Sequence, residues 1–260
     1  MSNWAIQTNL VDQQRAIDVA LAVQESGGCP YEVSVIPFCD DLMFPVEPPN
    51  KDLIAYGSTK LITSGIAAGM SGIFFNENFS TSVWNKHRQD MLNQHCNEFP
   101  LSGAPEALAF LPEDTQLFVR SCADLKAFAG MVTTVTSLVN HRESNIFGSN
   151  AVPPDTWISV AFPQEITAEY RCFVVGGRVI DAAIYRERGR RVNRRVPISL
   201  FQELAEDWLP HQTCVMDVAL LVNKLKVVEF NCFNASGFYG HNIKVIVEAV
   251  STWFDEVEAL

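Results

Sequence analysis

The sequence contains no C-x-x-C pair, and its seven cysteines are scattered along the chain in an odd number. This spacing is not typical of a structural zinc site or of a disulfide framework. Most of the cysteines lie within apolar segments, which indicates buried, reduced thiols. We therefore expect a cytoplasmic protein.

Long apolar stretches and a targeting segment are also lacking. No uninterrupted apolar run approaches the roughly 18–20 residues that span a bilayer. Residues 1–4 show no basic segment followed by an apolar stretch, so we expect neither a signal peptide nor association with a membrane. Hydrophobic residues nevertheless make up 48% of the 260 positions, which is typical of a globular protein with one large domain or two modest ones.

Basic residues are few. The 19 Lys and Arg against 30 Asp and Glu give a formal net charge of −11, which argues against general nucleic-acid binding. Six of the twelve arginines are concentrated in residues 186–195, RERGRRVNRR. The stretch is either an anion site or a solvated basic loop, and the arginines alone do not distinguish the two.

Hydrophobic periodicity predicts an α/β segment in the first hundred residues. Its helix, two strands and polar-faced helix are expected at residues 9–28, 31–38, 52–60 and 82–95. Proline and glycine become frequent at 99–114, where we place a domain boundary. The predicted domains are therefore residues 1–112 and 113–260.

The second part has the pattern of paired strands. One hairpin is expected to turn at Gly176-Gly177, and another occupies 214–233 with its turn around VNKL. An amphipathic helix over 240–257 closes the chain. Strands paired as hairpins with interspersed helices predict an α+β (mixed α/β) fold with antiparallel sheets.

The second hairpin carries an unusual polar set. If its register centres on Asn223, Asp217 and Glu229 face each other with Cβ atoms roughly 4.5–5.5 Å apart, which is unfavourable unless a cation compensates. Asn231 shares the face of Glu229 because strand side chains alternate. Such an oxygen-only set suits Mg²⁺. The alternative is an ordinary polar face of a hairpin, although apolar neighbours such as Phe230 indicate a covered strand.

These motifs together resemble the ATP-grasp ligases. The segment VMDVAL…KVVEFNCFNASGFY resembles the carboxy-terminal Asp…Glu-x-Asn signature of that superfamily. LFVRSCADLKAFAG is similar to the stretch of a clade that has an arginine where most members have a phosphate-binding lysine, and EYRCFVVGGRV resembles the strand between the two. The resemblance covers residues 113–250 and implies an ATP-grasp fold preceded by a small α/β domain.

The resemblance implies roles for individual residues. Asp217, Glu229 and Asn231 would bind Mg²⁺, while Arg120 and Lys126 would reach the phosphates of ATP. For Arg120 and Lys126 the alternatives are a surface ion pair and an exposed lysine on a helix face.

The remaining cofactor and catalytic positions follow from the same resemblance. Glu169 would bind the ribose, and Val160, Ala161 and Phe162 would lie beside adenine. Arg171 would contact a phosphate or an acyl intermediate, or else form a salt bridge. A flexible loop would begin after Tyr185, and these last candidates come from it or from the turn near the chain's end: Tyr185 and Arg186 at the cofactor, Arg188 and Arg190 at phosphate or substrate, and Asn234 and Ser236 at the acyl group or nucleophile.

The implied activity is the ATP- and Mg²⁺-dependent joining of a small-molecule or peptide carboxylate to an amine through an acyl phosphate. The five histidines are scattered and no G-x-S-x-G is present, so nothing indicates a nucleophilic triad. His241 is expected simply to precede the final helix. Two alternatives are a nucleotide-binding module without turnover and a phosphotransferase that uses the same site. Neither the substrates nor the oligomeric state follows from the sequence.

Overall fold

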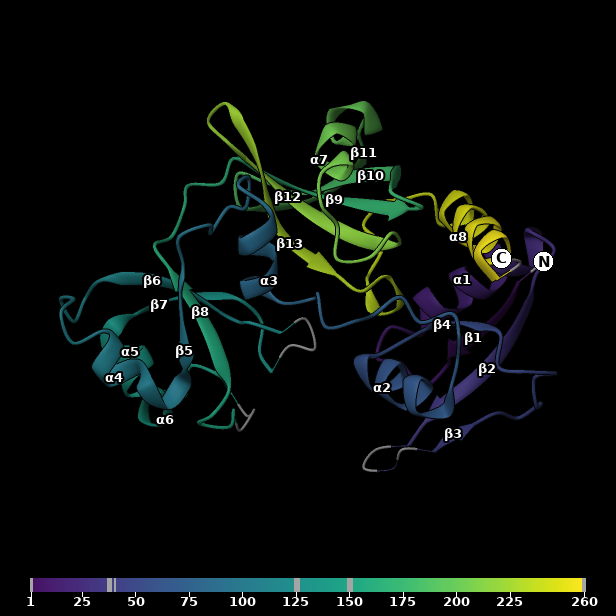
Figure 1. Cartoon of the computed structure of the whole chain (residues 1–260), viewed down its shortest axis with the longest axis horizontal. Coiled ribbons are helices and arrows are strands. Elements are labelled where there is room, and N and C mark those ends of the chain that lie inside the picture. The colour runs from purple at the N-terminus through teal and green to yellow at the C-terminus, as the bar shows by residue number, and fades with distance from the viewer. Residues whose placement is uncertain (1, 37–38, 40, 124–126, 149–151, 259–260) are drawn as a thin grey trace.

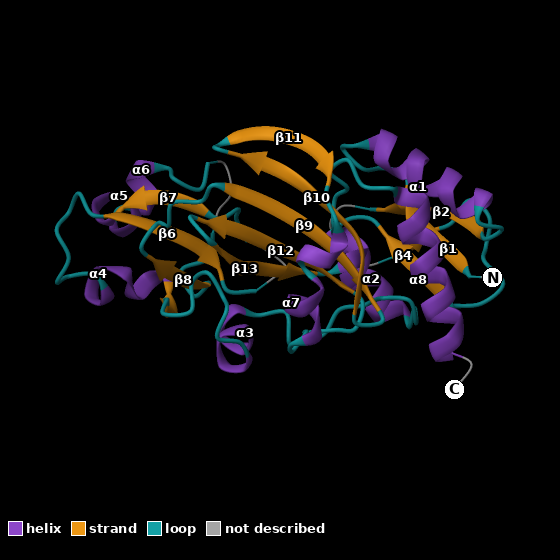
Figure 2. Cartoon of the chain, turned by 90° about the horizontal axis from the view of Figure 1, so that it is seen from above, coloured by secondary structure: helices purple, strands orange, loops and turns teal. Residues whose placement is uncertain are grey.

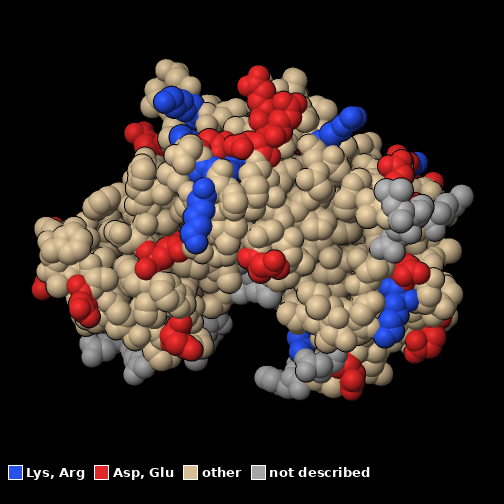
Figure 3. Space-filling model, in the orientation of Figure 1, with Lys and Arg blue, Asp and Glu red and all other residues tan. Residues whose placement is uncertain are grey.

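The protein is built from three sheets, each with its own set of covering helices (Figure 1). The computed structural model describes residues 2–36, 39, 41–123, 127–148 and 152–258. Among these residues, no helix combines the length and apolar character needed to cross a bilayer. The space-filling view shows a notch between the lobe of the middle sheet and the lobe of the N-terminal sheet (Figure 3).

The N-terminal sheet has the strand order β3-β2-β1-β4. Its region contains β1 (Asn3–Gln7), α1 (Gln13–Glu25), β2 (Cys29–Val35), β3 (Leu42–Met43), β4 (Leu53–Tyr56) and α2 (Thr59–Ala68). β1 pairs in parallel with β2 and β4, as expected where a helix carries the chain from one strand back to the next. The first hundred residues thus begin with the predicted α/β unit.

The middle sheet is antiparallel, with the order β5-β8-β6-β7. Its elements are β5 (Asn97–Pro100), α4 (Ala104–Ala107), β6 (Gln116–Ser121), β7 (Met131–Thr134), α5 (Val135–Val139), α6 (His141–Ser144) and β8 (Trp157–Ala161). Because β5 pairs with β8, the sheet begins ahead of the proposed boundary at residue 112. The division into domains stays a proposal, and this pairing supports a boundary before β5.

The large sheet is antiparallel, has the order β11-β10-β9-β12-β13, and fans across the centre of the molecule (Figure 2). Its region contains β9 (Ala168–Val175), β10 (Arg178–Glu187), β11 (Arg190–Arg195), α7 (Gln202–Glu206), β12 (Cys214–Leu221) and β13 (Lys224–Asn231). The predicted turn at Gly176-Gly177 joins β9 to β10, and both glycines have positive φ. The predicted α+β class is confirmed.

Two expectations about secondary structure are wrong. Residues 186–195 are not a flexible loop, because β10 continues to Glu187 and then turns at Arg188-Gly189 into the exposed edge strand β11. The helix expected over 82–95 is the shorter α3 (Thr81–His87). It ends where Arg88 becomes extended and buries its guanidinium against Asp90 and the backbone carbonyls of Leu204 and Trp208.

The two ends of the chain share one hydrophobic core. The final helix, α8 (Ile243–Glu258), packs against α1, and their apolar residues join a cluster with β1, β4, β9, β12 and the short helix η3 (Phe233–Ala235). Figure 1 shows α8 and α1 side by side at the junction of the large and N-terminal sheets. The C-terminal segment therefore fixes the position of the N-terminal sheet.

Asn234 fastens this junction. Its side chain is fully buried, donates to the carbonyls of Ala55 and Gly72 at 2.6 and 2.9 Å, and accepts from the amide of Phe74 at 2.7 Å. The expectation that Asn234 contacts an acyl group or nucleophile is wrong, because this carboxamide already satisfies three backbone groups.

We predict that Asn234→Ala lowers the free energy of unfolding by about 3 kcal/mol or more, since each buried polar group left without a partner costs about 1–3 kcal/mol. Urea unfolding followed by circular dichroism measures this change. The exposed Asn223 in the turn between β12 and β13 is the matched control, and Asn223→Ala is expected to have little effect. Equal stability of the two variants would contradict the role of Asn234.

Candidate active site

A cavity of about 380 Å³ lies between the middle sheet and the large sheet. Three arginines and three carboxylates line it: Arg120, Arg171, Arg186, Glu169, Asp217 and Glu229. Tyr185, Tyr239, Phe118, Phe128 and the backbone around Gly130 complete the wall. The cavity therefore combines apolar and aromatic walls with balanced, opposed charges.

A single row across the large sheet holds the centre of this site. Arg171 on β9 lies opposite Asp217 on β12, and Asp217 lies opposite Glu229 on β13. The predicted pairing of Asp217 with Glu229 is confirmed, but it depends on a bulge. Near the turn, Val218 pairs with Val227, and the extra residue Val228 then shifts the register by one.

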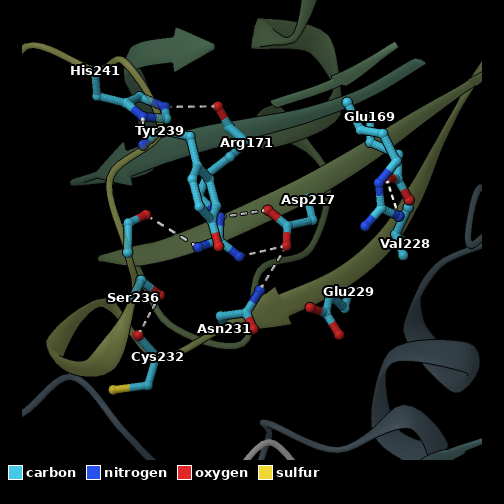
Figure 4. A network of polar contacts seen from close by, with 12 residues as sticks. Glu169, Arg171, Asp217, Val228, Glu229, Asn231, Cys232, Ser236, Tyr239 and His241 are labelled. Carbon is cyan, nitrogen blue, oxygen red and sulfur yellow. Dashed lines mark hydrogen bonds and ion pairs between the residues drawn. The ribbon is translucent and has the colours of Figure 1, made fainter. Parts of the chain in front are cut away.

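Arg171 and Asp217 form a buried bidentate pair. The guanidinium Nε and Nη2 donate to the two carboxylate oxygens at 2.8 and 2.7 Å (Figure 4). Burial opposes the charged form of Arg171, but the carboxylate of Asp217 more than compensates and the pKa of Arg171 is raised. Asn231 donates its amide to the same carboxylate at 3.2 Å. The fork of Arg171 thus provides a cation that the like-charged row requires.

Arg120 provides the second cation, from the middle sheet. It lies at the end of β6 and contacts the carboxylate of Glu229 at 2.7 Å. Its guanidinium stacks over the ring of Trp84, 5.2 Å from the centroid. This pair crosses from one sheet to the other, so a group bound between Arg120 and Glu229 contacts both sheets at once.

Glu169 and Arg186 form a third pair at the cavity. They are cross-strand neighbours on β9 and β10, and their side chains meet at 2.8 Å. Burial raises the pKa of the Glu169 carboxyl, against the opposing effect of Arg186. Glu169 is therefore held by a salt bridge in a position facing the cavity.

Some predicted site residues lie elsewhere. Val160 is buried in the core of the middle sheet, and neither Ala161 nor the largely exposed Phe162 lines the cavity. Arg188 and Arg190 are exposed on the hairpin between β10 and β11 and do not line it either. Lys126 falls outside the described residues.

Residues 104–249, more than half of the chain, match a family model described as an ATP-grasp domain, family 2 of one clade. The chain belongs to the ATP-grasp family. The resemblance inferred from the three sequence motifs is thereby confirmed. No curated protein matches the sequence.

Solved ATP-grasp structures match almost the whole chain. The D-cycloserine synthetase DcsG has a TM-score of 0.57 at 8% identity, covering 97% of this chain and 99% of that one. The ligase PsnB with a minimal precursor has 0.56 at 11%, with the same coverage. A RimK domain protein from Sphaerobacter thermophilus DSM 20745 has 0.55 at 13%, again covering 97% and 99%. At these identities the likeness establishes the ATP-grasp fold.

The oxygen donors of this ATP-grasp site fit a hard cation. Asp217, Glu229 and Asn231 lie in adjacent positions on one face of β12 and β13, with no sulfur or imidazole among them (Figure 4). Within the described residues, no group of three or more His, Cys, Asp or Glu side chains forms a metal cluster. The set therefore depends on the amide of Asn231 as its third donor.

His241 and Tyr239 position Arg171, and the sequence did not indicate this. The imidazole Nε2 donates to the carbonyl of Arg171 at 3.0 Å, and Nδ1 accepts the amide of Tyr239 at 2.9 Å. The Tyr239 ring covers the guanidinium of Arg171, 4.8 Å from its centroid. His241 does precede α8, as expected, but both its ring nitrogens are engaged at the site.

We predict that His241 makes this ATP-grasp chain sensitive to acid. Burial lowers its pKa to about 4, and protonation at Nδ1 breaks the bond from Tyr239. Between pH 6.5 and 4 the unfolded chain takes up a proton that the folded chain does not, so stability falls as pH falls, by at most about 1.4 kcal/mol per pH unit.

Urea unfolding of the wild type and of His241→Gln across this pH range tests the assignment. His241→Gln is expected to show a flatter dependence, by up to one proton, while the exposed His95→Gln retains the wild-type slope. Identical slopes for His241→Gln and the wild type would disprove it.

Proposed function

We propose that the chain is a ligase that uses ATP and Mg²⁺ to join a carboxylate to an amine. The observation that carries the proposal is the set of three arginine–carboxylate pairs lining one cavity between two sheets. A magnesium-bound triphosphate carries both a cation for the carboxylates and anionic oxygens for the arginines. Membership of the ATP-grasp family supports the same conclusion.

Binding in this proposal is an exchange of partners. Asp217, Glu229 and Asn231 would hold Mg²⁺, which when bound neutralises phosphate charge and orients the γ-phosphoryl group. Arg120 and Arg171 would transfer their hydrogen bonds from carboxylates to phosphate oxygens. Because every buried charge keeps a partner before and after binding, the exchange avoids the cost of an unpaired buried ion.

Glu169 and Arg186 have a separate role at the same cavity. A carboxylate accepts two donors at once, so Glu169 would bind the ribose hydroxyls when Arg186 turns to a phosphate. The pair is partly exposed at Arg186, which allows this rearrangement at small cost. The exposed Arg188 and Arg190 are at most substrate contacts in a closed state.

The chemistry would proceed in two transfers. A substrate oxygen attacks the γ-phosphorus, the bond to the β-phosphate oxygen breaks, and an acyl phosphate and ADP form. An amine then attacks the acyl carbon, phosphate leaves, and the amine loses a proton to give the amide. The chain contributes positioning and charge stabilisation. The four buried cysteines support a reducing cytoplasm as its location.

We predict that Glu229→Gln weakens binding of Mg²⁺–ATP by roughly tenfold or more, the scale on which metal sites lose affinity when their supporting groups change. Calorimetry with a non-hydrolysable ATP analogue measures this. The exposed Glu187→Gln on β10 is the matched control. In EDTA, Glu229→Gln should bind the nucleotide at least as well as the wild type, because the variant loses a negative charge. An unchanged affinity with Mg²⁺ would refute the metal assignment.

Turnover is tested by ADP release with panels of carboxylates and amines, followed by mass spectrometry of the products. A ligase yields a product with the mass of the two substrates less one water. A phosphorylated hydroxyl would identify a phosphotransferase, and nucleotide binding without ADP release on any pair would identify a binding module.

A further inference from the structure

A second cavity, of about 280 Å³, adjoins the first. Arg171 and Tyr239 line both cavities, so the two meet at the guanidinium of Arg171. The other lining residues come from the turn after β13, from the start of α2 and from α1: Asn231, Cys232, Ala235, Ser236, Gly237, Thr59, Ile62 and Arg15. The second cavity therefore lies between the N-terminal sheet's helices and the large sheet.

The charge of the second cavity differs from that of the first. Its lining contains two arginines and no Asp or Glu, whereas the first cavity is lined by three of each charge. In a chain with a net charge of −11 this local excess of positive charge is unusual. It favours an anionic occupant.

Both arginines meet the same residue, Gly237. Arg171 donates from Nη1 to the Gly237 carbonyl at 3.1 Å. A methyl group placed on Gly237 would lie 3.4 Å from Cζ and both terminal nitrogens of Arg15, so the face of that guanidinium covers this glycine. The two cationic groups thus flank one residue, and an anion at each would be separated by a short chain.

Helix stability does not account for Arg15. It lies in the first turn of α1, where the helix dipole disfavours a cation. Its only ion pair among the described residues is with Asp12, at 3.0 Å, and about a third of the Arg15 side chain is exposed. An exposed pair of this kind contributes little, typically below about 1 kcal/mol, so Arg15 can bind another anion at little cost.

We propose, on the basis of the ligase function above, that the second cavity binds a small dicarboxylate and that Arg15 selects it. The reacting carboxylate lies at Arg171, where the second cavity opens onto the nucleotide cavity. The other carboxylate lies at Arg15, and Ile62 and Ala235 contact the methylene chain between them. The substrate class is therefore a dicarboxylic acid or an acidic amino acid.

Calorimetry in the presence of Mg²⁺ and ADP tests the proposal without turnover. The probes are succinate, glutarate, L-aspartate and L-glutamate, with butyrate, L-asparagine and L-glutamine as matched monocarboxylates. At least one dicarboxylate is expected to bind the wild type about tenfold or more tightly than its matched monocarboxylate. Arg15→Gln should abolish that difference by weakening only the dicarboxylate, and Arg15→Lys should restore part of it.

Two further variants sharpen the result. Asp12→Asn keeps a good helix cap but removes the competing charge, so dicarboxylate affinity should rise. Arg188→Gln removes an equal charge from an exposed position outside both cavities and should have no effect. Unfolding curves confirm that each variant is folded.

Equal affinity for both members of every pair, equal weakening of both by Arg15→Gln, or no binding of any dicarboxylate would overturn the proposal. Its failure is distinguishable from failure of the ligase function, because nucleotide affinity is measured separately. If Mg²⁺–ATP binds and Glu229→Gln weakens it while no dicarboxylate is preferred, the choice of substrate class alone is wrong.

Discussion

The buried pair between Arg171 and Asp217 is the interaction on which the rest of the site depends. It joins β9 to β12 in the middle of the large sheet, and both residues are less than a tenth exposed. Losing one partner of such a pair costs about 3–5 kcal/mol, because the other charge stays buried. The same guanidinium holds the carbonyl of Gly237, and the Arg171 carbonyl accepts from His241. The central charge of the site and the path of the C-terminal turn are therefore fixed together.

This arrangement explains how an acidic chain prepares a site for a polyanion. Each arginine at the first cavity is already paired with a carboxylate, so the site by itself has no net excess of positive charge to stabilise. The carboxylates hold the guanidinium groups close to the positions that phosphate oxygens would require, and the rigid sheets limit the movement that the exchange needs. The surface itself stays acidic, with Asp and Glu side chains gathered over α7 (Figure 3).

Sequence patterns predicted the parts that depend on local periodicity. The α+β class, the Gly176-Gly177 turn and the facing of Asp217 and Glu229 all follow from alternation and turn residues. The arginine partners did not follow, because Arg120 reaches Glu229 from another sheet and nothing local records that contact. β11 was missed because an edge strand exposed on both faces lacks alternation. Asn234 was misassigned because a buried carboxamide that caps backbone groups has the same sequence signature as one that binds a ligand.

The two cavities meet at Arg171, and this bears on how the chain divides its work. The residues of the first cavity lie on β6, β9, β10, β12 and β13 and on the loops beside them, whereas Arg15 and Thr59 bring the N-terminal helices α1 and α2 to the second. A phosphoryl group that passes from a nucleotide to a carboxylate must cross from one cavity to the other. Its negative charge would remain beside one permanently charged guanidinium throughout. Substrate choice can therefore change through α1 and α2 while the nucleotide chemistry, held by the large sheet, stays the same.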